Sequence, residues 1–383
     1  MKRLGAFVVL LAALAAVEVA NSGHEFPVYP SYYPHEIRIQ TLAPEKAAGS
    51  LLESGIQAYI GQEPHFAGAL PESIRAVESL GSFVIVRVNP QSPLVKDHAS
   101  ACAIARTVVR DIAARHGDVV FHPYPVTPLH GDYLYHADLA DAARSRLLGD
   151  PADASAPAIR SLKVRAGGAL AKSLVRPAWS TKGSAWDAAV DEVSAADLVA
   201  SSTMAMNGWL GPPALRTGWF QAARLLAPSV DDPAAQERVQ GNLRRLETGA
   251  YENALERINL ERELVAQLAA GCRALVAGYT VKREYISTEY NAGIENIGFD
   301  AIEGLNSPMF MRTVKLKDFP WNGWLTLGTD TPPAAAWNPI AGFTDRFGRL
   351  MWSALGDPAL LPSPYDEGWM LNRISDVQSS PGR

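Results

Sequence analysis

Cysteine is scarce in this chain of 383 residues, which contains only Cys102 and Cys272. No CxxC pair and no CxxCH haem attachment motif occurs, which argues against those redox and haem classes. If the two cysteines pair, they close a very long loop that ties the first third of the chain to its middle. If they do not pair, each is a small buried residue on the apolar face of a predicted helix. The sequence leaves both alternatives open.

Long apolar runs are absent after Val17, so no later segment is long enough to cross a bilayer. Before that point, two basic residues precede an apolar stretch from Leu4 to Val17, and small and polar residues follow up to Ser22. This order is typical of a secretory signal peptide. We therefore expect residues 1–22 to be removed on export, leaving a mature protein without a membrane span, periplasmic or secreted.

An excess of basic residues is also lacking, since the formal net charge is −5. Removal of residues 1–22 takes away two basic residues and one acidic residue, which changes the charge to −6. This balance gives no support to nucleic-acid binding. The roughly 360 residues that remain suggest two domains, or one large domain with an insertion, at about 100 to 200 residues per domain.

The local signatures of the common enzyme classes are missing as well. The sequence has no GxSxG nucleophile elbow, no HExxH zinc helix, no phosphate-binding loop and no dinucleotide fingerprint. These absences argue against the corresponding enzymes, although a convergent catalytic site leaves no local signature. The sequence therefore does not fix a reaction.

Histidine is absent from residues 137–383, because all eight histidines lie in the first 136 residues. Histidine is the commonest metal ligand and titrates near neutral pH, so its confinement points to one region for chemistry. Three of the eight lie in the segment His122 to Asp138, which follows a predicted strand. Open α/β sheets place their ligand crevices at such strand ends.

This segment offers a metal-ligand set made of His122, His130, His136 and Asp138. Imidazole and carboxylate groups together suit zinc, copper or iron, and they can leave one position open for a substrate. In the alternative interpretation, the imidazoles are ordinary loop side chains that bond to tyrosine hydroxyls and backbone groups. A transition metal is the one cofactor that the sequence indicates.

His98 and Cys102 form a second and weaker metal hypothesis. They are four residues apart, so they share one face of a predicted helix and make half of a soft-metal site. The alternative is a histidine at the helix start beside a buried or disulfide-bonded cysteine.

The first third of the chain alternates strand and helix patterns, which favours a sheet covered by helices. We expect strands at residues 35–42, 82–88 and 118–121, and helices at residues 47–60, 97–116 and 137–148. Residues 154–182 follow with six basic residues and no acidic one. They are either a strand, a glycine turn and a helix start around residues 164–170, or a solvated basic linker.

Helical periodicity dominates the middle of the chain. We expect helices at residues 187–206, 214–227 and 233–279. Pro233 marks the start of the last one, and Gly249 divides it in two. Its apolar stripe comprises Ile258, Val265, Leu268, Cys272 and Leu275.

The last hundred residues are rich in glycine, proline and tryptophan. We expect a strand at residues 314–319 and a short helix at residues 343–355. Trp321 and Trp324 lie among glycines and prolines, where aromatic rings can form a stiff wall for a ligand. In the alternative, these rings cap a core that regular structure does not cover.

Together these patterns predict a mixed α/β fold with an N-terminal α/β lobe built on a small sheet, a long helical middle and a loop-rich aromatic C-terminal segment. The expected boundaries are residues 23–150, 151–186, 187–280 and 281–383. In layout alone the chain resembles a two-lobed solute-binding protein, in which strand-end loops line a cleft between the lobes.

The favoured function is an exported binding or accessory protein for a small-molecule solute. We expect its cleft between the His122 to Asp138 segment and the tryptophan region, with ligand contacts from Tyr124, Asp132, Tyr135, Trp321 and Trp324. One alternative is a metal-dependent periplasmic enzyme that uses His122, His130 and His136, with Asp132 or Asp138 as ligand or general base. The other is a structural protein partner within an exported complex.

Overall fold

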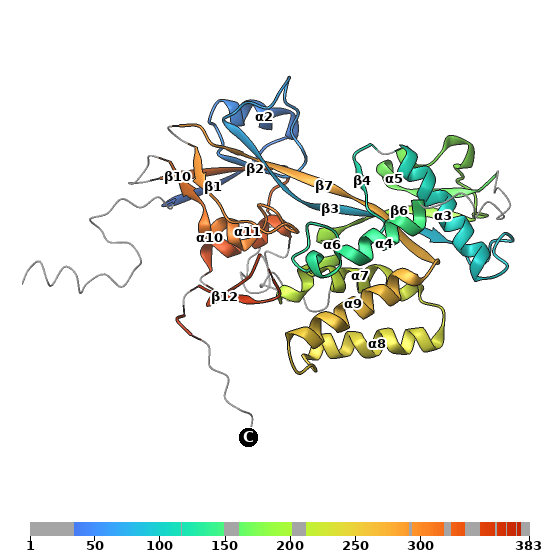
Figure 1. Cartoon of the computed structure of the whole chain (residues 1–383). Coiled ribbons are helices and arrows are strands. Elements are labelled where there is room, and N and C mark those ends of the chain that lie inside the picture. The colour runs from blue at the N-terminus through green and yellow to red at the C-terminus, as the bar shows by residue number, and fades with distance from the viewer. Residues whose placement is uncertain are drawn as a thin grey trace, which may run out of the picture. The chain divides into compact units, whose positions relative to one another are not determined.

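The computed structural model describes residues 34–115, 117–148, 161–200, 212–290, 293–317, 323–333, 345–356, 358–364, 366–372 and 374–376. The expected signal peptide and Trp321 lie outside these residues. Within them the fold is mixed α/β, as the sequence predicts (Figure 1). Two compact units make up the chain. The first unit comprises residues 1–76, 284–298 and 312–332, and the second unit comprises residues 77–283, 299–311 and 333–383.

The first unit contains a parallel three-stranded arrangement of β1 (Glu36–Thr41), β10 (Trp324–Thr329) and β2 (Ala58–Ile60). β2 also pairs antiparallel with the end of β7 (Ala274–Ser287). Helix α2 (Pro44–Leu52) contributes Leu51 to a small core with Tyr59 and Tyr285. A short antiparallel ribbon joins β8 (Ile294–Asn296) to β9 (Lys315–Leu316).

The helix expected at residues 47–60 is shorter than the sequence predicts. It ends at Leu52, and Ser54 then adopts a positive φ of 58°, which a continuing right-handed helix does not allow. The apolar residues from Ala58 to Ile60 join the sheet as β2. Three buried residues in a row are equally compatible with a helix face and with a central strand, so their pattern alone could not decide.

The second unit is built on a mixed sheet. Its strands follow the order β7, β3 (Ile74–Val88), β6 (Ala188–Ser194) and β5 (Val164–Gly167). β3 and β6 are antiparallel, whereas β5 and β6 are parallel. The short strand β4 (Val119–Phe121) pairs antiparallel with residues 278–280 of β7. The His122 to Asp138 segment therefore begins directly after a strand of this sheet.

Two apolar cores stabilise the second unit. One contains Ile104 and Val108 of helix α3 (His98–Arg115) together with Val164 and Val190 of the sheet. The other contains residues of α7 (Gly218–Leu226) and α9 (Ala254–Ala270) packed with Val276. Figure 1 shows α9 lying alongside α8 (Pro233–Thr248). The second unit also contains α4 (Ala137–Leu148), α5 (Gly168–Leu174), α6 (Ala195–Ala200) and α11 (Arg346–Leu355).

The basic segment adopts the strand, turn and helix alternative. Residues 164–167 form β5, and α5 begins at Gly168 with a φ of 92° that favours glycine. The short α10 (Pro308–Thr313) lies further along the chain, and β11 (Leu360–Pro362) pairs antiparallel with β12 (Trp369–Leu371). Single 3₁₀ turns occur at Tyr133–Tyr135, Pro177–Trp179, Pro213–Arg216 and Ala227–Ser229.

The helical middle is interrupted by two strands that the sequence analysis assigned to helices. Residues 188–194 form β6, because Ala188 and Val190 are completely buried beside β3. Residues from Ala274 onward belong to β7, so Leu275 is a strand residue. The division at Gly249 is confirmed, since that residue ends α8 with a φ of 68°. Within the C-terminal strand and helix that the sequence predicts, residues 315–316 form β9 and residues 346–355 form α11, while residues 318–319 and 343–344 lie outside the described residues.

Cys102 and Cys272 form a disulfide across 170 residues of sequence, with their Cα atoms 4.9 Å apart. This resolves the choice that the sequence leaves open, and it joins α3 to the turn that precedes β7. In the described ranges, no helix combines the length and the apolar character that crossing a membrane requires.

Candidate functional site

A small cavity of about 100 Å³ lies within the second unit and is lined in part by the His122 to Asp138 segment. Its floor and walls combine acidic and basic side chains with a few apolar ones. The lining residues come from four stretches of chain and α9: Leu129, Gly131, Asp132, Tyr135, Pro213, Arg216, Thr217, Arg257, Asp300, Ala301, Ile302, Ser363, Pro364, Asp366 and Glu367. Four of these are acidic and two are basic, so the cavity has an excess of negative groups.

Two of the predicted ligand contacts, Asp132 and Tyr135, line this cavity. Tyr124 is buried behind it, with 1% of its surface exposed. Trp324 is 57% exposed on β10 of the first unit, where the guanidinium of Arg38 lies 5.0 Å from its ring centroid. Trp321 lies outside the described residues. The expected cleft between the histidine segment and the tryptophans therefore stays a prediction.

Hydrogen bonds to backbone groups and to Gln221 engage the imidazoles of His122 and His130. His122 Nε2 lies 2.8 Å from the carbonyl oxygen of Val126. His130 Nδ1 accepts a bond from the Thr127 backbone N–H at 2.9 Å, so Nε2 carries the proton and donates to Gln221 Oε1 at 3.2 Å. Desolvation lowers the pKa of both histidines. Both rings are therefore neutral, and their hydrogen bonds stabilise the conformation of the loop.

Asp132 connects the loop to the start of α7. Its two carboxylate oxygens accept the backbone N–H groups of Gly218 at 2.9 Å and Trp219 at 3.1 Å. These N–H groups lack partners inside the helix, and the helix dipole favours a negative charge there. A side chain at Gly218 would place a Cβ atom 2.9 Å from Val126 Cβ, so only glycine permits this approach. The loop and α7 thereby hold Asp132 in one position.

His136 is the third imidazole of the segment, and it is completely buried. Its Nδ1 lies 3.1 Å from the hydroxyl of Tyr124, whereas its Nε2 has no hydrogen-bond partner among the described residues. Desolvation lowers the pKa of His136 to about 4, and the nearby Asp132 opposes that shift. The ring is therefore neutral at physiological pH and leaves one nitrogen unused.

Glu261 approaches this imidazole from α9 and is also completely buried. Its Oε1 accepts a bond from Arg257 at 2.6 Å, and its Oε2 has no bond to a donor among the described residues. Desolvation, reinforced by the negative charge of Glu367, raises the pKa of Glu261 to about 9, while Arg257 opposes the shift. At this pKa the carboxyl holds a proton at neutral pH and can donate it to Glu367.

One ligating atom from each of Asp132, His136 and Glu261 lies within 4.8 Å of the others. The predicted set of His122, His130, His136 and Asp138 is not gathered among the described residues, since His136 is the member that joins a cluster. Asp138 instead pairs with Arg262 at 2.7 Å near the surface, and that hydrogen bond lowers its pKa to about 2. Loop geometry, which decides which side chains converge, is invisible to sequence spacing.

Glu261 is the residue that the sequence analysis missed, although a signal was present. It lies three residues after Ile258 and four before Val265, on the apolar stripe of the same helix. A carboxylate at a buried stripe position is rare unless it is paired. That observation alone could have indicated Glu261 as a candidate site residue.

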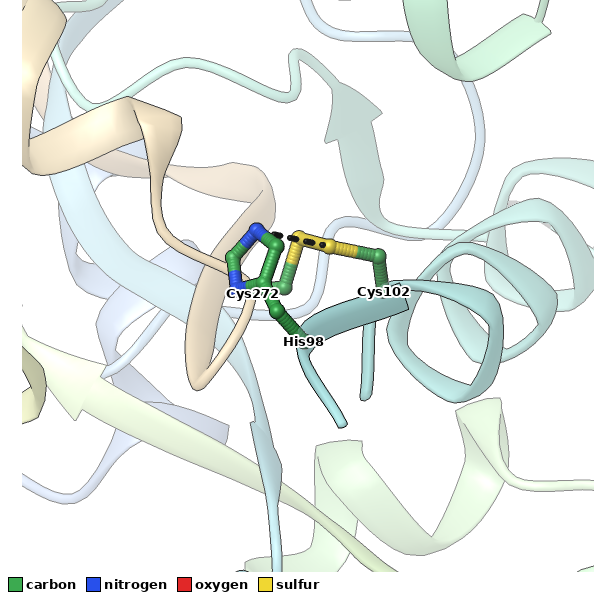
Figure 2. Close-up of side chains that lie close together, drawn as sticks. All are labelled: His98, Cys102 and Cys272. Atoms are coloured by element: carbon green, nitrogen blue, oxygen red, sulfur yellow. Dashed lines mark hydrogen bonds between the residues drawn. A yellow bond between two sulfur atoms is a disulfide. The ribbon is translucent and has the colours of Figure 1, made fainter. Parts of the chain in front are cut away.

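A second cluster gathers His98 with the disulfide. Figure 2 shows the imidazole of His98 beside the sulfur of Cys102, with Nε2 at 3.4 Å from Sγ. The two sulfurs are bonded to each other, so neither is the thiolate that binds a soft metal. The half-site hypothesis for His98 and Cys102 therefore gives way to its alternative, a histidine beside a disulfide.

Ion pairs engage both arginines that line the cavity. Arg216 pairs with Glu303 at 2.5 Å and lies 3.5 Å from Asp300. Burial on its own would raise the pKa of Glu303, but the charge of Arg216 holds it below its usual value. Arg257 similarly bridges Glu261 and Glu367, at 2.6 and 2.9 Å. These pairs fix the orientation of the groups that a ligand would meet.

No protein-family model and no curated protein matches this chain. Some solved structures show a weak likeness. The periplasmic binding protein DppA from Helicobacter pylori, in complex with a peptide, is 11% identical, with a TM-score of 0.41; the match covers 72% of this chain and 56% of that protein. A substrate binding protein from Microbacterium hydrocarbonoxydans is 12% identical, with a TM-score of 0.35 and coverage of 69% and 56%. The chain spans little more than half of their length, and likeness at this level assigns no family.

Proposed function

We propose that this chain is an exported binding protein for a small polar solute, which it holds in the cavity beside Asp132 and Tyr135. The observation that carries the proposal is the cavity itself, a space of about 100 Å³ lined by oriented charges. A water molecule needs roughly 10–15 Å³ of such space, so the cavity has room for several waters or one compact solute. A few placed polar groups in a concave site are typical of small-molecule recognition.

The lining charges favour a solute that carries a positive group. Acidic lining residues outnumber basic ones, and Asp366 is an exposed carboxylate at the rim. Arg216 and Arg257 are each paired with carboxylates, so they offer little free positive charge to an anion. A cationic solute would meet the excess of carboxylates directly.

Export is supported by the disulfide between Cys102 and Cys272. Disulfides persist in oxidising compartments and are rare in the reducing cytosol. Together with the expected signal peptide, this bond favours a periplasmic or secreted location. The metal-dependent enzyme and the structural partner stay predictions from the sequence.

A thermal-shift screen of small amines, amino acids and carboxylic acids tests the proposal. A bound solute stabilises the folded state by mass action, so a cationic compound should raise the melting temperature and its uncharged analogue should not. Asp366→Asn should reduce the shift, because it removes a rim charge. Asp118→Asn provides the matched control, since Asp118 is exposed and does not line the cavity. A screen in which carboxylic acids alone stabilise the protein contradicts the charge preference.

A further inference from the structure

Two potential ligand atoms in the second unit are buried without partners. His136 Nε2 makes no hydrogen bond among the described residues, Glu261 Oε2 accepts none from a donor there, and both side chains are completely buried. A buried polar atom without a partner is destabilising, because it loses its hydrogen bonds to water and gains none in return. Native structures leave such atoms rarely, and each one calls for an explanation, of which an ion is one.

The side chains of His136 and Glu261 come together from separate parts of the sequence. His136 follows the loop, Glu261 lies on α9, and Asp132 completes a trio whose ligating atoms lie within 4.8 Å of one another. A hydrogen bond to a neighbouring group orients each of the three side chains. Tyr124 bonds to His136, Arg257 bonds to Glu261, and the start of α7 bonds to Asp132. Such outer contacts orient the ligands of protein metal sites.

We propose that Asp132, His136 and Glu261 bind a divalent transition-metal ion, for which Zn²⁺ is the probe. Neutral imidazole and carboxylate groups are ligands that Zn²⁺ accepts at about 2.0–2.2 Å. Ligand atoms at that distance from one ion lie about 3–4 Å apart, so the trio needs side-chain shifts of less than about 1 Å. Three protein ligands leave a fourth position for water or a small molecule.

The charge around the trio matches a dication. When the ion displaces the proton of Glu261, the side chains of Asp132, Glu261 and Glu367 supply three carboxylates, and Arg257 neutralises one of them through its contacts with Glu261 and Glu367. The ion also has a route, because Asp132, Arg257 and Glu367 line the cavity. The inference goes beyond the proposed solute binding and does not depend on it.

Calorimetric titration of the chelator-treated, disulfide-intact full chain with Zn²⁺ tests the site. We expect one equivalent to bind, and we expect Glu261→Gln and His136→Gln each to weaken binding at least tenfold. Glu263→Gln is the matched control, because it makes the same change on the exposed face of the same helix. Binding that survives both substitutions overturns the proposal, as does a wild-type protein that binds no Zn²⁺.

X-ray absorption of the Zn²⁺-loaded wild-type protein gives a readout that needs no variant. The proposal predicts a nitrogen and oxygen shell with one imidazole and no sulfur. Two or more imidazoles in the observed shell would place the ion at His122 and His130, and a sulfur ligand would place it at the cysteines. Either result overturns the assignment. If Zn²⁺ fails to bind while a cationic solute still does, Glu261 shares a proton with Glu367, and the solute proposal stands without the ion.

Discussion

Val126 and Gly218 set the position of Asp132, because their close contact brings the loop onto the start of α7. At the scale of single residues, a methyl group added at position 218 should therefore disturb the candidate site, although the methyl group itself does not contact the site. Packed interiors respond to even one added carbon, since neighbouring atoms have no free space to move into.

Gly218→Ala should lower the free energy of unfolding by about 1–3 kcal/mol through overpacking against Val126. Urea denaturation measures the change. Gly241→Ala is the matched control, because position 241 lies inside α8 with no atom within 4 Å of the added Cβ. There alanine should stabilise the protein by about 0.5–1 kcal/mol, as expected for a helix interior. Equal effects at both positions would contradict the packing argument.

Sequence reasoning found part of the candidate site and missed the rest for definable reasons. Asp132 and His136 lie in the segment that the histidine distribution marked, and both are in the buried cluster. His122 and His130 lie in the same segment, but backbone and amide groups engage their rings. Convergence depends on how the loop folds back on α9, which no local spacing encodes.

At the scale of elements, the residues that start and end a helix predicted helix positions better than apolar periodicity did. Asp232 accepts the Ala235 N–H at 2.9 Å and starts α8, and Gly249 ends it, as the sequence predicts. Periodicity failed at β6 and at the start of β7, where small and β-branched residues are buried on both faces of the sheet. A short buried strand and a buried helix segment have the same apolar pattern.

The cap of α8 gives a prediction at this scale. Asp232→Ala removes the acceptor for Ala235 N–H and should destabilise the protein by about 1 kcal/mol. Glu237→Ala on the exposed face of the same helix should change stability by less than about 0.5 kcal/mol. Chemical denaturation of both variants compares them directly, and a larger loss for Glu237→Ala would contradict the assignment of the cap.

At the scale of the whole molecule, the disulfide is the strongest covalent constraint on the second unit. It closes a loop across 170 residues and joins α3 to the turn before β7. Such a loop restricts the unfolded chain, and removal of a native disulfide is typically destabilising by about 2–5 kcal/mol. This bond also keeps His98 beside a sulfur that cannot ligate a metal.

Reduction should therefore lower the melting temperature of the wild-type protein. The double variant Cys102→Ala, Cys272→Ala should have that lower melting temperature without reductant, and the reductant should not change it. Differential scanning calorimetry with and without dithiothreitol checks both statements. An unchanged melting temperature on complete reduction, verified by thiol titration, would show that the bond does not constrain the unfolded chain as described.

The proposed function requires that a solute binds in the cavity lined by Asp132 and Tyr135, and isothermal titration calorimetry measures this binding. The ligand is the cationic compound that gives the largest thermal shift, titrated into wild-type protein, Tyr135→Ala and Leu134→Ala. Tyr135 lines the cavity, whereas its neighbour Leu134 is 83% exposed and does not. The account predicts one site per chain, a loss of at least tenfold in affinity for Tyr135→Ala, and unchanged affinity for Leu134→Ala. Equal affinity in all three proteins would place the solute elsewhere and contradict the account.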